Sequence, residues 1–160
     1  MSGHRAHVIT VSDGVSAGTR EDLSGPALVT LLQNADFEVS GPEVVPDTHD
    51  RISDAIVGAV VNGADFVVTT GGTGLGPRDV TPEATAAICD KLIPGLAEEM
   101  RRKGLESTPR AVLSRCIAGV RGATLIVNLP GSPKGAAESL AAIAALLPHA
   151  SQIVHGARHE

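Results

Sequence analysis

Runs of β-branched side chains alternate with helix-like patterns along the first half of the chain. Residues 7–11, 38–45 and 66–70 have strand character, and each run stops at turn-forming or glycine-rich sequence. Between them, residues 25–35 and 52–60 carry apolar side chains at the three-four spacing of an amphipathic helix. This alternation predicts a parallel sheet with helices on both faces, because each crossover is right-handed and has to cover the sheet.

Helix starts are marked by small polar residues and by proline. Ser24 is the expected N-cap of the first helix. Thr81 is the expected N-cap of a later helix, with Pro82 at its first helical position. The apolar side of that later helix is expected to include Ala86, Ala87 and Leu92. Residues 95–105 are predicted to form the next helix, which ends in basic side chains.

The last part of the chain changes the sheet and adds a long helix. Residues 116–120 and 124–128 are strand-like and are separated by a short turn, so we expect an antiparallel pair and a mixed sheet. Ser132 is typical of a helix N-cap. An Ala/Leu-rich helix is expected to run from there to Leu147, and Pro148 is expected to end or kink it.

Length and composition favour one domain with an aliphatic core. At 160 residues the chain has the usual size of a single domain, so we assign residues 1–160 to one domain. Hydrophobic residues make up 42% of the chain, and Trp and Tyr do not occur. Phe37 and Phe66 are the two aromatic residues, which argues against binding of single-stranded nucleic acid, because such surfaces stack bases on aromatic rings.

The charge pattern excludes a general attraction for polyanions. The 13 Lys and Arg side chains against 18 Asp and Glu give a formal net charge of −5. The basic residues are scattered, so we expect no nucleic acid and no membrane among the partners. No apolar stretch approaches membrane-spanning length, and residues 1–5 lead into a strand without a signal-peptide pattern. We therefore expect a cytoplasmic protein.

The cysteines and histidines carry no pattern of a metal or redox centre. Cys89 and Cys116 lack CxxC or Cys/His spacing and lie in apolar sequence, so we expect both to be buried small hydrophobic side chains. The six His residues also lack ligand spacing, and none is adjacent to a convincing nucleophile. A metal-hydrolase or serine-hydrolase centre is therefore not predicted.

Four loops with polar or glycine-rich sequence follow predicted strands. They begin at Ser12, Pro46, Gly71 and Pro130. In an open α/β sheet, ligands bind beyond the carboxyl ends of the parallel strands. We therefore expect three of these loops to converge on one edge of the sheet and to form the pocket there.

The loop with four glycines is a candidate phosphate site. Gly71, Gly72, Gly74 and Gly76 permit positive φ and let backbone N–H groups approach an anion. No Gly-Lys-Ser/Thr follows, so the loop is not a Walker A sequence, and Pro77 occupies the third glycine position of the dinucleotide fingerprint. Taken alone, the stretch is explained equally well as a flexible turn between a strand and a helix.

Two acidic residues strengthen the case for a phosphate site. Asp79 lies just before a capped helix, where it could hold Mg²⁺ beside phosphates bound by the glycine loop. Asp47, at the end of the second strand, could be its partner, because Mg²⁺ typically takes one or two carboxylates plus substrate phosphates. A role as a turn cap explains Asp47 equally well, and Asp13 belongs more readily to a common Asp-Gly turn.

Other polar positions have both ordinary and functional explanations. Ser132 is explained as an N-cap and Lys134 as a solvated first-turn residue. The functional alternative is that exposed N–H groups there bind a phosphate, with Lys134 adding charge. Ser114 and Arg115 precede a strand and, on their own, indicate only a surface position.

Two stretches in combination resemble a known family. The first has Thr-Gly-Gly-Thr-Gly from Thr70 and Arg-Asp-Val-Thr-Pro-Glu-Ala from Arg78, and the second has Asn-Leu-Pro-Gly-Ser-Pro-Lys from Asn128. They resemble the signatures of the molybdopterin adenylyltransferase family (Mog/MoaB-like), which includes the G domain of gephyrin. The resemblance spans nearly the whole chain. It implies an α/β fold, a three-layer α/β/α sandwich with a mostly parallel mixed sheet, assembled as a homotrimer.

The resemblance also implies an activity and its residues. The expected enzyme is an adenylyltransferase with Mg²⁺ as cofactor and ATP and molybdopterin as substrates. It transfers AMP from Mg-ATP to the terminal phosphate of molybdopterin, and the product passes to a molybdenum-inserting protein. Asp47 and Asp79 correspond to the catalytic, metal-binding acids. The residues expected to contact the substrates are Ser12, Asp13, Gly71, Gly72, Thr73, Gly74, Ser114, Arg115, Asn128, Pro130, Gly131, Ser132 and Lys134.

Two alternatives stay open. The first is a non-catalytic relative that binds molybdopterin without adenylylating it; relatives of that type tend to lack an acid at the position of Asp47, which this chain retains. The second is another enzyme built on the same domain, a molybdenum-inserting transferase or a nucleotide hydrolase of the competence-damage type. Those enzymes normally carry additional domains, so the short length favours the adenylyltransferase. The chain departs from many relatives at Gly14, where they carry Arg.

Overall fold

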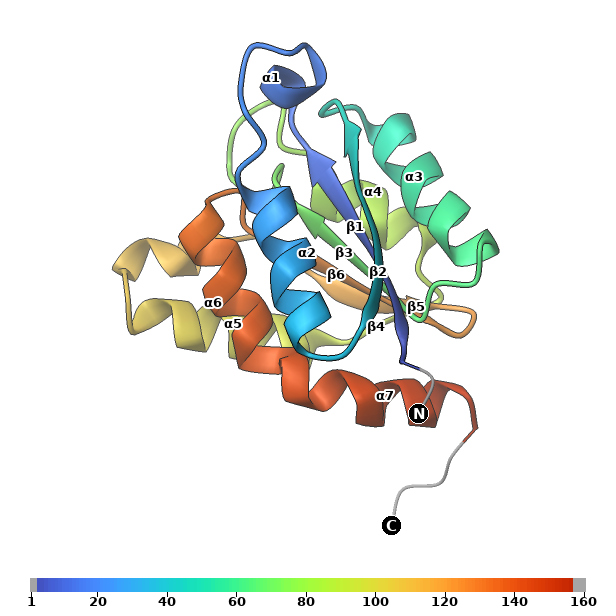
Figure 1. The fold of residues 1–160 in the computed structure, drawn as a ribbon. Helices are drawn as coiled ribbons and strands as arrows, with labels where there is room; N and C mark the ends of the chain where they lie inside the picture. Colours follow the sequence, from blue (N-terminus) through green and yellow to red (C-terminus); the bar gives the residue numbers. More distant parts are fainter. Residues whose placement is uncertain (1–2, 157–160) are drawn as a thin grey trace.

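A computed structural model describes residues 3–156 and shows a six-stranded sheet between two layers of helices (Figure 1). The strands are β1 (Arg5–Val11), β2 (Glu38–Val45), β3 (Phe66–Thr70), β4 (Lys91–Leu92), β5 (Ala118–Arg121) and β6 (Thr124–Leu129). Their order across the sheet is β2-β1-β3-β6-β5-β4. The first four in this order are parallel, whereas β5 is antiparallel to both β6 and β4. The predicted mixed, mostly parallel sheet is confirmed.

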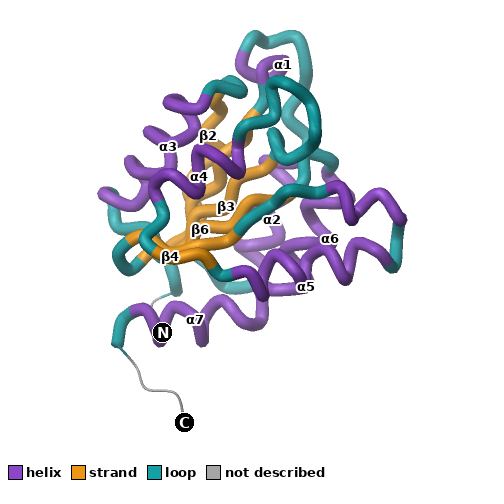
Figure 2. The backbone as a smooth tube through the Cα atoms, turned by 180° about the vertical axis from the view of Figure 1, so that it is seen from behind, coloured by secondary structure: helices purple, strands orange, loops and turns teal. Residues whose placement is uncertain are grey.

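The helices divide between the two faces of the sheet. They are α1 (Asp13–Ser16), α2 (Ser24–Asn34), α3 (His49–Val61), α4 (Thr81–Ile88), α5 (Pro94–Leu105), η1 (Pro109–Leu113), α6 (Pro133–Ile143), η2 (Ala144–Leu146) and α7 (Leu147–Val154). Helices α2, α5, α6 and α7 pack on one face, and α3 and α4 on the other, as the front and rear views show (Figures 1 and 2). The predicted three-layer arrangement is therefore confirmed.

Strand β1 illustrates how the alternation of side chains builds the two layers. Ala6 and Val8 belong to the core cluster under α2, α5, α6 and α7, whereas Ile9 and Val11 belong to the cluster under α3 and α4. A strand directs successive side chains to opposite faces, so a continuous apolar run fills both layers. Each fully buried aliphatic side chain contributes about 1.5–3 kcal/mol to folding.

The helix that begins at Thr81 differs from its prediction in its cap and in its length. Thr81 lies inside α4, and its hydroxyl donates to the Gly71 carbonyl at 2.9 Å instead of capping the helix. The helix ends at Ile88, and the next residues form β4, a strand that the sequence analysis missed. Ala86 and Ala87 are exposed, and Leu92, which lies in β4, is also exposed. Pairing of β4 with β5 overrides the helical pattern there.

The first long helix, α2, is capped by a residue other than the predicted Ser24. Ser24 is its first helical residue and is buried. The Asp22 carboxylate accepts a hydrogen bond from the Gly25 N–H at 2.9 Å and so provides the cap. Asp22 is thereby fixed beside the carboxyl end of β1, where the Thr10 hydroxyl also donates to it at 2.8 Å.

The predicted last helix is broken into two. Helix α6 ends at Ile143, three residues of 3-10 helix follow, and Pro148 lies in the first turn of α7 instead of ending the helix. The run Pro133–Val154 has 22 residues and contains an 18-residue window with a mean hydropathy of 1.2, so by length and composition alone it is sufficient to cross a membrane. The expectation that no stretch reaches this length was wrong. Its inward side chains, however, belong to the core, and α6 and α7 point in different directions (Figure 1).

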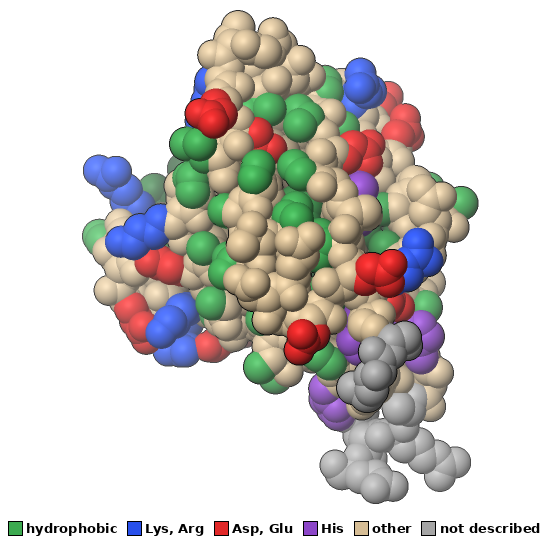
Figure 3. Space-filling model, in the orientation of Figure 1, with side chains coloured by type: hydrophobic (Ala, Val, Ile, Leu, Met, Phe, Trp, Pro, Cys, Tyr) green, Lys and Arg blue, Asp and Glu red, His purple; other side chains and the backbone are tan. Residues whose placement is uncertain are grey.

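The surface charges and Cys116 agree with the predictions from the composition, whereas Cys89 is less buried than predicted. On the face drawn in Figure 3, the Lys and Arg side chains of the described part are dispersed among Asp and Glu and do not gather in one patch. Cys116 is buried as predicted, whereas Cys89 is half-buried at the end of α4. Burial raises the pKa of the Cys89 thiol to about 11, which keeps it protonated and unreactive at neutral pH. Residues 1–2, part of the N-terminal stretch considered for targeting, lie outside the described residues.

Candidate active site

Four loops meet at the carboxyl edge of the parallel strands. Strands β1, β2, β3 and β6 all run in the same direction, so the residues that follow them lie at the same edge. The register places Thr70 beside Thr10 on one side and beside Leu129 on the other. We predicted that three of the four loops converge, and in the structure all four do, because the four strands are parallel.

Asp13 and Asp47 connect the first two loops by reciprocal hydrogen bonds. The Asp13 N–H donates to Asp47 Oδ2 at 2.9 Å, and the Asp47 N–H donates to Asp13 Oδ1 at 2.9 Å. Arg78 adds a two-point contact to Asp13, with Nε and Nη2 both 3.0 Å from the carboxylate oxygens. These hydrogen bonds hold the pKa of the Asp13 carboxyl below its ordinary value. Asp13 is therefore a structural anion that fixes the loops, with its charge already paired.

One oxygen of Asp47 is left without a partner. Asp47 Oδ1 is buried and accepts no hydrogen bond from any described residue, whereas Oδ2 accepts one from Asp13. Burial raises the pKa of this carboxyl above its ordinary value, and the nearby charges of Asp13 and Asp79 act in the same direction. A buried oxygen without a partner costs about 1–3 kcal/mol, and more if it is charged, so its retention here indicates a ligand that completes the site.

The glycine loop is shaped by positions where a side chain has no room. Gly71 has φ +104° and Gly72 has φ +69°, a region that favours glycine. A Cβ on Gly71 would collide with the Val11 carbonyl, and a Cβ on Gly72 would collide with the Thr81 hydroxyl and lie 2.9 Å from Asp47 Oδ1. Glycine therefore lets the loop backbone approach both β1 and the unpartnered carboxylate oxygen.

Arg115 holds both ends of the segment that carries Asp79. Its Nε donates to the Gly74 carbonyl at 2.7 Å and its Nη2 to the Asp79 carbonyl at 2.8 Å. Glu83 accepts from both terminal nitrogens, with the shortest contact at 2.7 Å, and this contact lowers the pKa of Glu83. All three guanidinium nitrogens are thus engaged within the protein. The structure places Arg115 as a positioning residue, which differs from the predicted phosphate contact.

Asp79 itself turns back on its own loop. Its Oδ2 accepts a hydrogen bond from the Gly76 N–H at 2.9 Å, and an added Cβ on Gly74 or Gly76 would lie 2.9 Å from the same oxygen. Asp79 lies close enough to Asp47 for its charge to raise the pKa of that carboxyl. No group of three or more His, Cys, Asp or Glu side chains among the described residues is arranged to hold a metal ion. A cation would therefore need phosphate oxygens in addition to these two acids.

Asn128 and Lys134 lie away from the place that the sequence predicts for them. Asn128 is fully buried: its Nδ2 donates to the hydroxyls of Thr69 and Thr85, and its Oδ1 accepts from the Ile117 N–H. With these bonds it joins β6 to α4 and has no atom free for a substrate. Lys134 has an 80% exposed side chain and lies 3.9 Å from Glu138 of α6.

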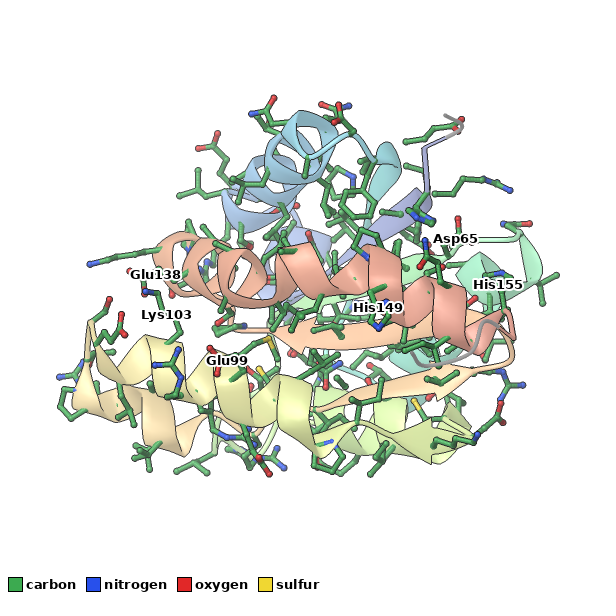
Figure 4. The ribbon with its side chains drawn as sticks, turned by 90° about the horizontal axis from the view of Figure 1, so that it is seen from below. Asp65, Glu99, Lys103, Glu138, His149 and His155 are labelled. Carbon is green, nitrogen blue, oxygen red and sulfur yellow. The ribbon has the colours of Figure 1, made fainter. Side chains whose placement is uncertain are left out.

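Glu138 lies on α6 beside α5, where the labelled Glu99 and Lys103 are found (Figure 4). It also accepts a hydrogen bond from the Ser107 hydroxyl at 3.0 Å. Lys134 thus pairs with a residue of its own helix, and it lines neither of the two cavities at the strand ends.

Two adjoining cavities open at the loops. The first, here called the acidic cavity, has a volume of about 450 Å³; from the predicted set it is lined by Ser12, Asp47, Gly71, Gly72, Asp79, Gly131 and Ser132. The second, called the apolar cavity, has about 440 Å³ and includes Leu75, Met100 and Leu113; from the predicted set it is lined by Thr73, Gly74, Ser114, Pro130 and Ser132. Ser132 borders both, and its hydroxyl caps α6 by accepting from the Gly135 N–H at 3.1 Å.

The acidic cavity includes three charged residues that the sequence analysis missed. Arg20, Glu21 and Asp22 line it and belong to the connection between α1 and α2. The available signal was their position, because this charged run lies in a long loop that leaves the carboxyl end of a parallel strand. No motif singled them out. They are far in sequence from the glycine loop, so nothing in the sequence indicated that they line the same cavity.

Comparison with known proteins identifies the family. A family model described as a probable molybdopterin binding domain matches residues 7–149. A molybdopterin adenylyltransferase of Helicobacter pylori is 41% identical over 155 residues, covering 93% of this chain and 86% of the relative. Gephyrin of Dictyostelium discoideum is 38% identical over 158 residues, covering 92% of this chain and 22% of gephyrin.

A comparison with solved structures supports the same family. The molybdopterin biosynthesis enzyme MoaB from Thermus thermophilus is 49% identical and superposes with a TM-score of 0.89, covering 98% of this chain and 99% of that one. The match in sequence and the match in fold thus extend over the same, nearly complete, length. The chain therefore belongs to the molybdopterin adenylyltransferase family, whose members carry the probable molybdopterin binding domain.

Proposed function

We propose that the protein is an adenylyltransferase that transfers AMP from Mg-ATP to the terminal phosphate of molybdopterin. A phosphate oxygen of the pterin forms a bond to the α-phosphorus of ATP, the bond from that phosphorus to the bridging oxygen breaks, and pyrophosphate leaves. The observation that carries this proposal is the unpartnered, buried Asp47 Oδ1 beside a glycine loop that borders two cavities. Relatives with that name and 41% identity support it.

The acidic cavity suits the triphosphate of the nucleotide with its cation. Asp47 and Asp79 would hold Mg²⁺, which would supply charge neutralisation between the two reacting anions. The donor set fits, because carboxylate oxygens are the ligands that Mg²⁺ prefers and Asp47 Oδ1 has no other partner. The backbone N–H groups of the glycine loop are placed to stabilise phosphate oxygens as their charge changes in the transition state.

The apolar cavity suits the second substrate. Leu75, Met100 and Leu113 provide apolar contact for a flat ring system, and Ser114 and Ser132 provide hydroxyls for its polar edge or its phosphate. Because Ser132 borders both cavities, a pterin phosphate near it would face the nucleotide in the acidic cavity. Holding the two reactants in adjoining cavities lowers the entropic cost of their encounter.

The retained Asp47 favours catalysis over the two alternatives. A protein that only binds molybdopterin has no use for a half-buried acid with an unpartnered oxygen, since that group destabilises the fold. A molybdenum-inserting or nucleotide-hydrolysing enzyme of the same fold is a second candidate. The full-length match to an adenylyltransferase argues against it.

Assembly and location are further parts of the proposal. We propose a homotrimer in the cytoplasm that passes its product to a molybdenum-inserting protein, in keeping with the family resemblance. Sedimentation equilibrium is expected to give a mass three times the chain mass of 16.3 kDa. A mass equal to that of one chain would contradict the trimer.

The decisive experiment is turnover with purified substrates. We expect wild-type protein with molybdopterin, Mg²⁺ and ATP to form adenylylated pterin and pyrophosphate in equal amounts. Asp79→Asn is expected to abolish both products while its circular dichroism spectrum stays native. Absence of both products with the wild-type protein would refute the activity, and wild-type rates in Asp79→Asn would remove Asp79 from the mechanism.

A further inference from the structure

Several basic side chains lie at the carboxyl edge of the sheet, and Arg101 and Arg110 line the apolar cavity there. Arg78 is paired with Asp13, Arg115 with Glu83 and two carbonyls, and Lys134 with Glu138. The guanidinium of Arg20 makes no hydrogen bond or ion pair with any residue in the described part of the chain. Arg20 is thus the one Lys or Arg among residues 3–156 that lines the acidic cavity, and its guanidinium is free to bind an anion there.

Arg20 also lies on the cavity proposed for the nucleotide. It lines the acidic cavity together with Asp47, Asp79, Glu21 and Asp22, and no other Lys or Arg of residues 3–156 lines it. Four acids around one base would repel a polyphosphate, and a bound Mg²⁺ leaves the nucleotide with net negative charge. A guanidinium at the rim supplies the opposite charge, and its planar fork matches two phosphate oxygens at once.

The stem of Arg20 is held in place by Gly14. The Gly14 carbonyl accepts from the Thr19 N–H at 2.9 Å and from the Arg20 N–H at 3.2 Å, which closes the loop. A Cβ on Gly14 would lie 2.8 Å from Cδ and 3.1 Å from Cγ of Arg20, so the aliphatic stem lies against the bare glycine backbone. This contact limits the directions that the guanidinium can take before a ligand arrives, which reduces the entropy lost on binding.

From these observations we infer that Arg20 binds the triphosphate of the nucleotide at the rim of the acidic cavity and then the pyrophosphate that leaves. The inference rests on the proposed function, because that function supplies the nucleotide. It assigns to Arg20 a direct contact with substrate that neither Arg115 nor Lys134 is free to make. The reaction gives this contact its use, because negative charge accumulates on the departing pyrophosphate.

Calorimetric titration of the full chain with three probes tests the inference. The probes are Mg-ATP, Mg-pyrophosphate and AMP. Loss of a charge-assisted contact to phosphate in Arg20→Ala is expected to raise the Kd of Mg-ATP and of Mg-pyrophosphate about tenfold and to change that of AMP less than about twofold. Arg20→Lys is expected to recover part of the loss, since it keeps the charge without the fork.

Two further variants test whether the position of the Arg20 charge matters, and not only its presence. Gly14→Ala keeps Arg20 but displaces its stem, so it is expected to weaken Mg-pyrophosphate binding in the wild-type background and to have no further effect in Arg20→Ala. Arg51→Ala is the matched control, because Arg51 is an exposed arginine on α3 that has no ion pair with any described residue and lies outside both cavities. It is expected to bind all three probes like the wild type.

The outcomes distinguish this inference from the proposed function. Equal Kd values of Mg-pyrophosphate for wild type and Arg20→Ala would overturn the role of Arg20, and so would an equal loss for AMP and Mg-ATP. A wild-type protein that binds Mg-pyrophosphate through Arg20 but forms no adenylylated pterin would refute the adenylyl transfer and leave the inference standing.

Discussion

The half-buried carboxylate of Asp47 lowers the stability of the fold, although the proposed function requires it. Its carboxyl is half-buried with one unpartnered oxygen, and burial raises its pKa above the ordinary value of 3.8. The unfolded chain therefore loses this proton at a lower pH than the folded chain does. Stability contributed by the protonated carboxyl is present below the unfolded pKa and is lost as the pH rises through the folded pKa.

Asp47→Asn is therefore expected to raise the thermal midpoint at neutral pH while abolishing turnover. The gain should disappear as the pH falls below the ordinary pKa of 3.8, where the carboxyl is protonated in the folded and the unfolded chain alike. Thermal melts in both pH ranges measure it. Asp54→Asn, which changes an exposed carboxylate on α3, is the control and is expected to melt like the wild type. A lower midpoint for Asp47→Asn at neutral pH would contradict this account.

Gly72 combines a left-handed backbone with close contacts. Gly72→Ala is expected to cost about 1 kcal/mol for its φ of +69° and more for the collision with Thr81, and to remove activity because the added methyl approaches Asp47 Oδ1. Gly122→Ala is the matched control: its φ is +58°, but nothing lies within 4 Å of an added Cβ. Denaturant titration and turnover are measured for both variants. Gly122→Ala reports the effect of backbone strain alone, and Gly72→Ala reports strain together with the steric contacts. Equal losses of stability in the two variants would show that the contacts do not matter.

Single residues could be predicted from the sequence where their type and position restrict their role. The common place of Asp47 and Asp79 was predicted because the loops that carry them follow strands whose carboxyl ends meet at one edge, while their roles stay predictions. The partners of Asn128 and Arg115 could not be predicted, because they come from α4, β3 and the glycine loop, and no local pattern shows that these partners use up their hydrogen-bonding groups. Arg20 was missed for the opposite reason, since only the folded chain shows that it has no partner.

At the scale of elements, Arg115 connects the strand-side loop at residues 74–79 to helix α4. It bonds the carbonyls of Gly74 and Asp79 and the carboxylate of Glu83 in the first turn of that helix. One planar group thereby fixes both ends of the loop and the start of the next element. Such a three-way contact needs the geometry of a guanidinium.

Arg115→Lys is expected to lower kcat roughly tenfold or more, because an ammonium cannot bridge the three acceptors and Asp79 then moves from its productive place. Amide hydrogen exchange in residues 74–79 should become faster while the global melting midpoint changes little. Arg102→Lys, in an exposed pair with Glu99, is expected to leave both measurements unchanged. Native rates of exchange and turnover in Arg115→Lys would exclude the positioning role.

The elements show where local pattern suffices and where it does not. The strands β1, β2, β3 and β6 were predicted close to their observed bounds, because each is a β-branched run that stops at turn-forming sequence, whether it is fully buried, as in β3 and β6, or largely exposed, as in β2. Strand β4 has two exposed residues and exists through its pairing with β5, so nothing in its own sequence indicated it. The cap of α2 came from Asp22 instead of Ser24 because the third residue before Gly25 also reaches its N–H.

For the whole molecule, the alternation of strands and helices was sufficient to predict the layers, while the assignment of residues 1–160 to one domain stays a prediction. The long run of α6, η2 and α7 was the part whose role composition could not settle, because apolar core helices and membrane helices share their composition. Its neighbours resolve the question. Leu140, Ile143 and Leu147 pack in the same cluster as Leu28 of α2 and Met100 of α5.

If this run closes one layer of the core, single substitutions along it should differ sharply in cost. Ile143 is 0% exposed and Leu146, three residues later, is 50% exposed. Ile143→Ala is expected to lower the free energy of unfolding by about 2–5 kcal/mol, because it removes buried methyl groups and leaves a cavity, whereas Leu146→Ala is expected to cost about 1 kcal/mol or less. Urea titration of both variants measures the difference. A membrane-spanning helix would instead present both side chains to lipid, so equal small losses, together with partition of the protein into detergent, would contradict its place in the core.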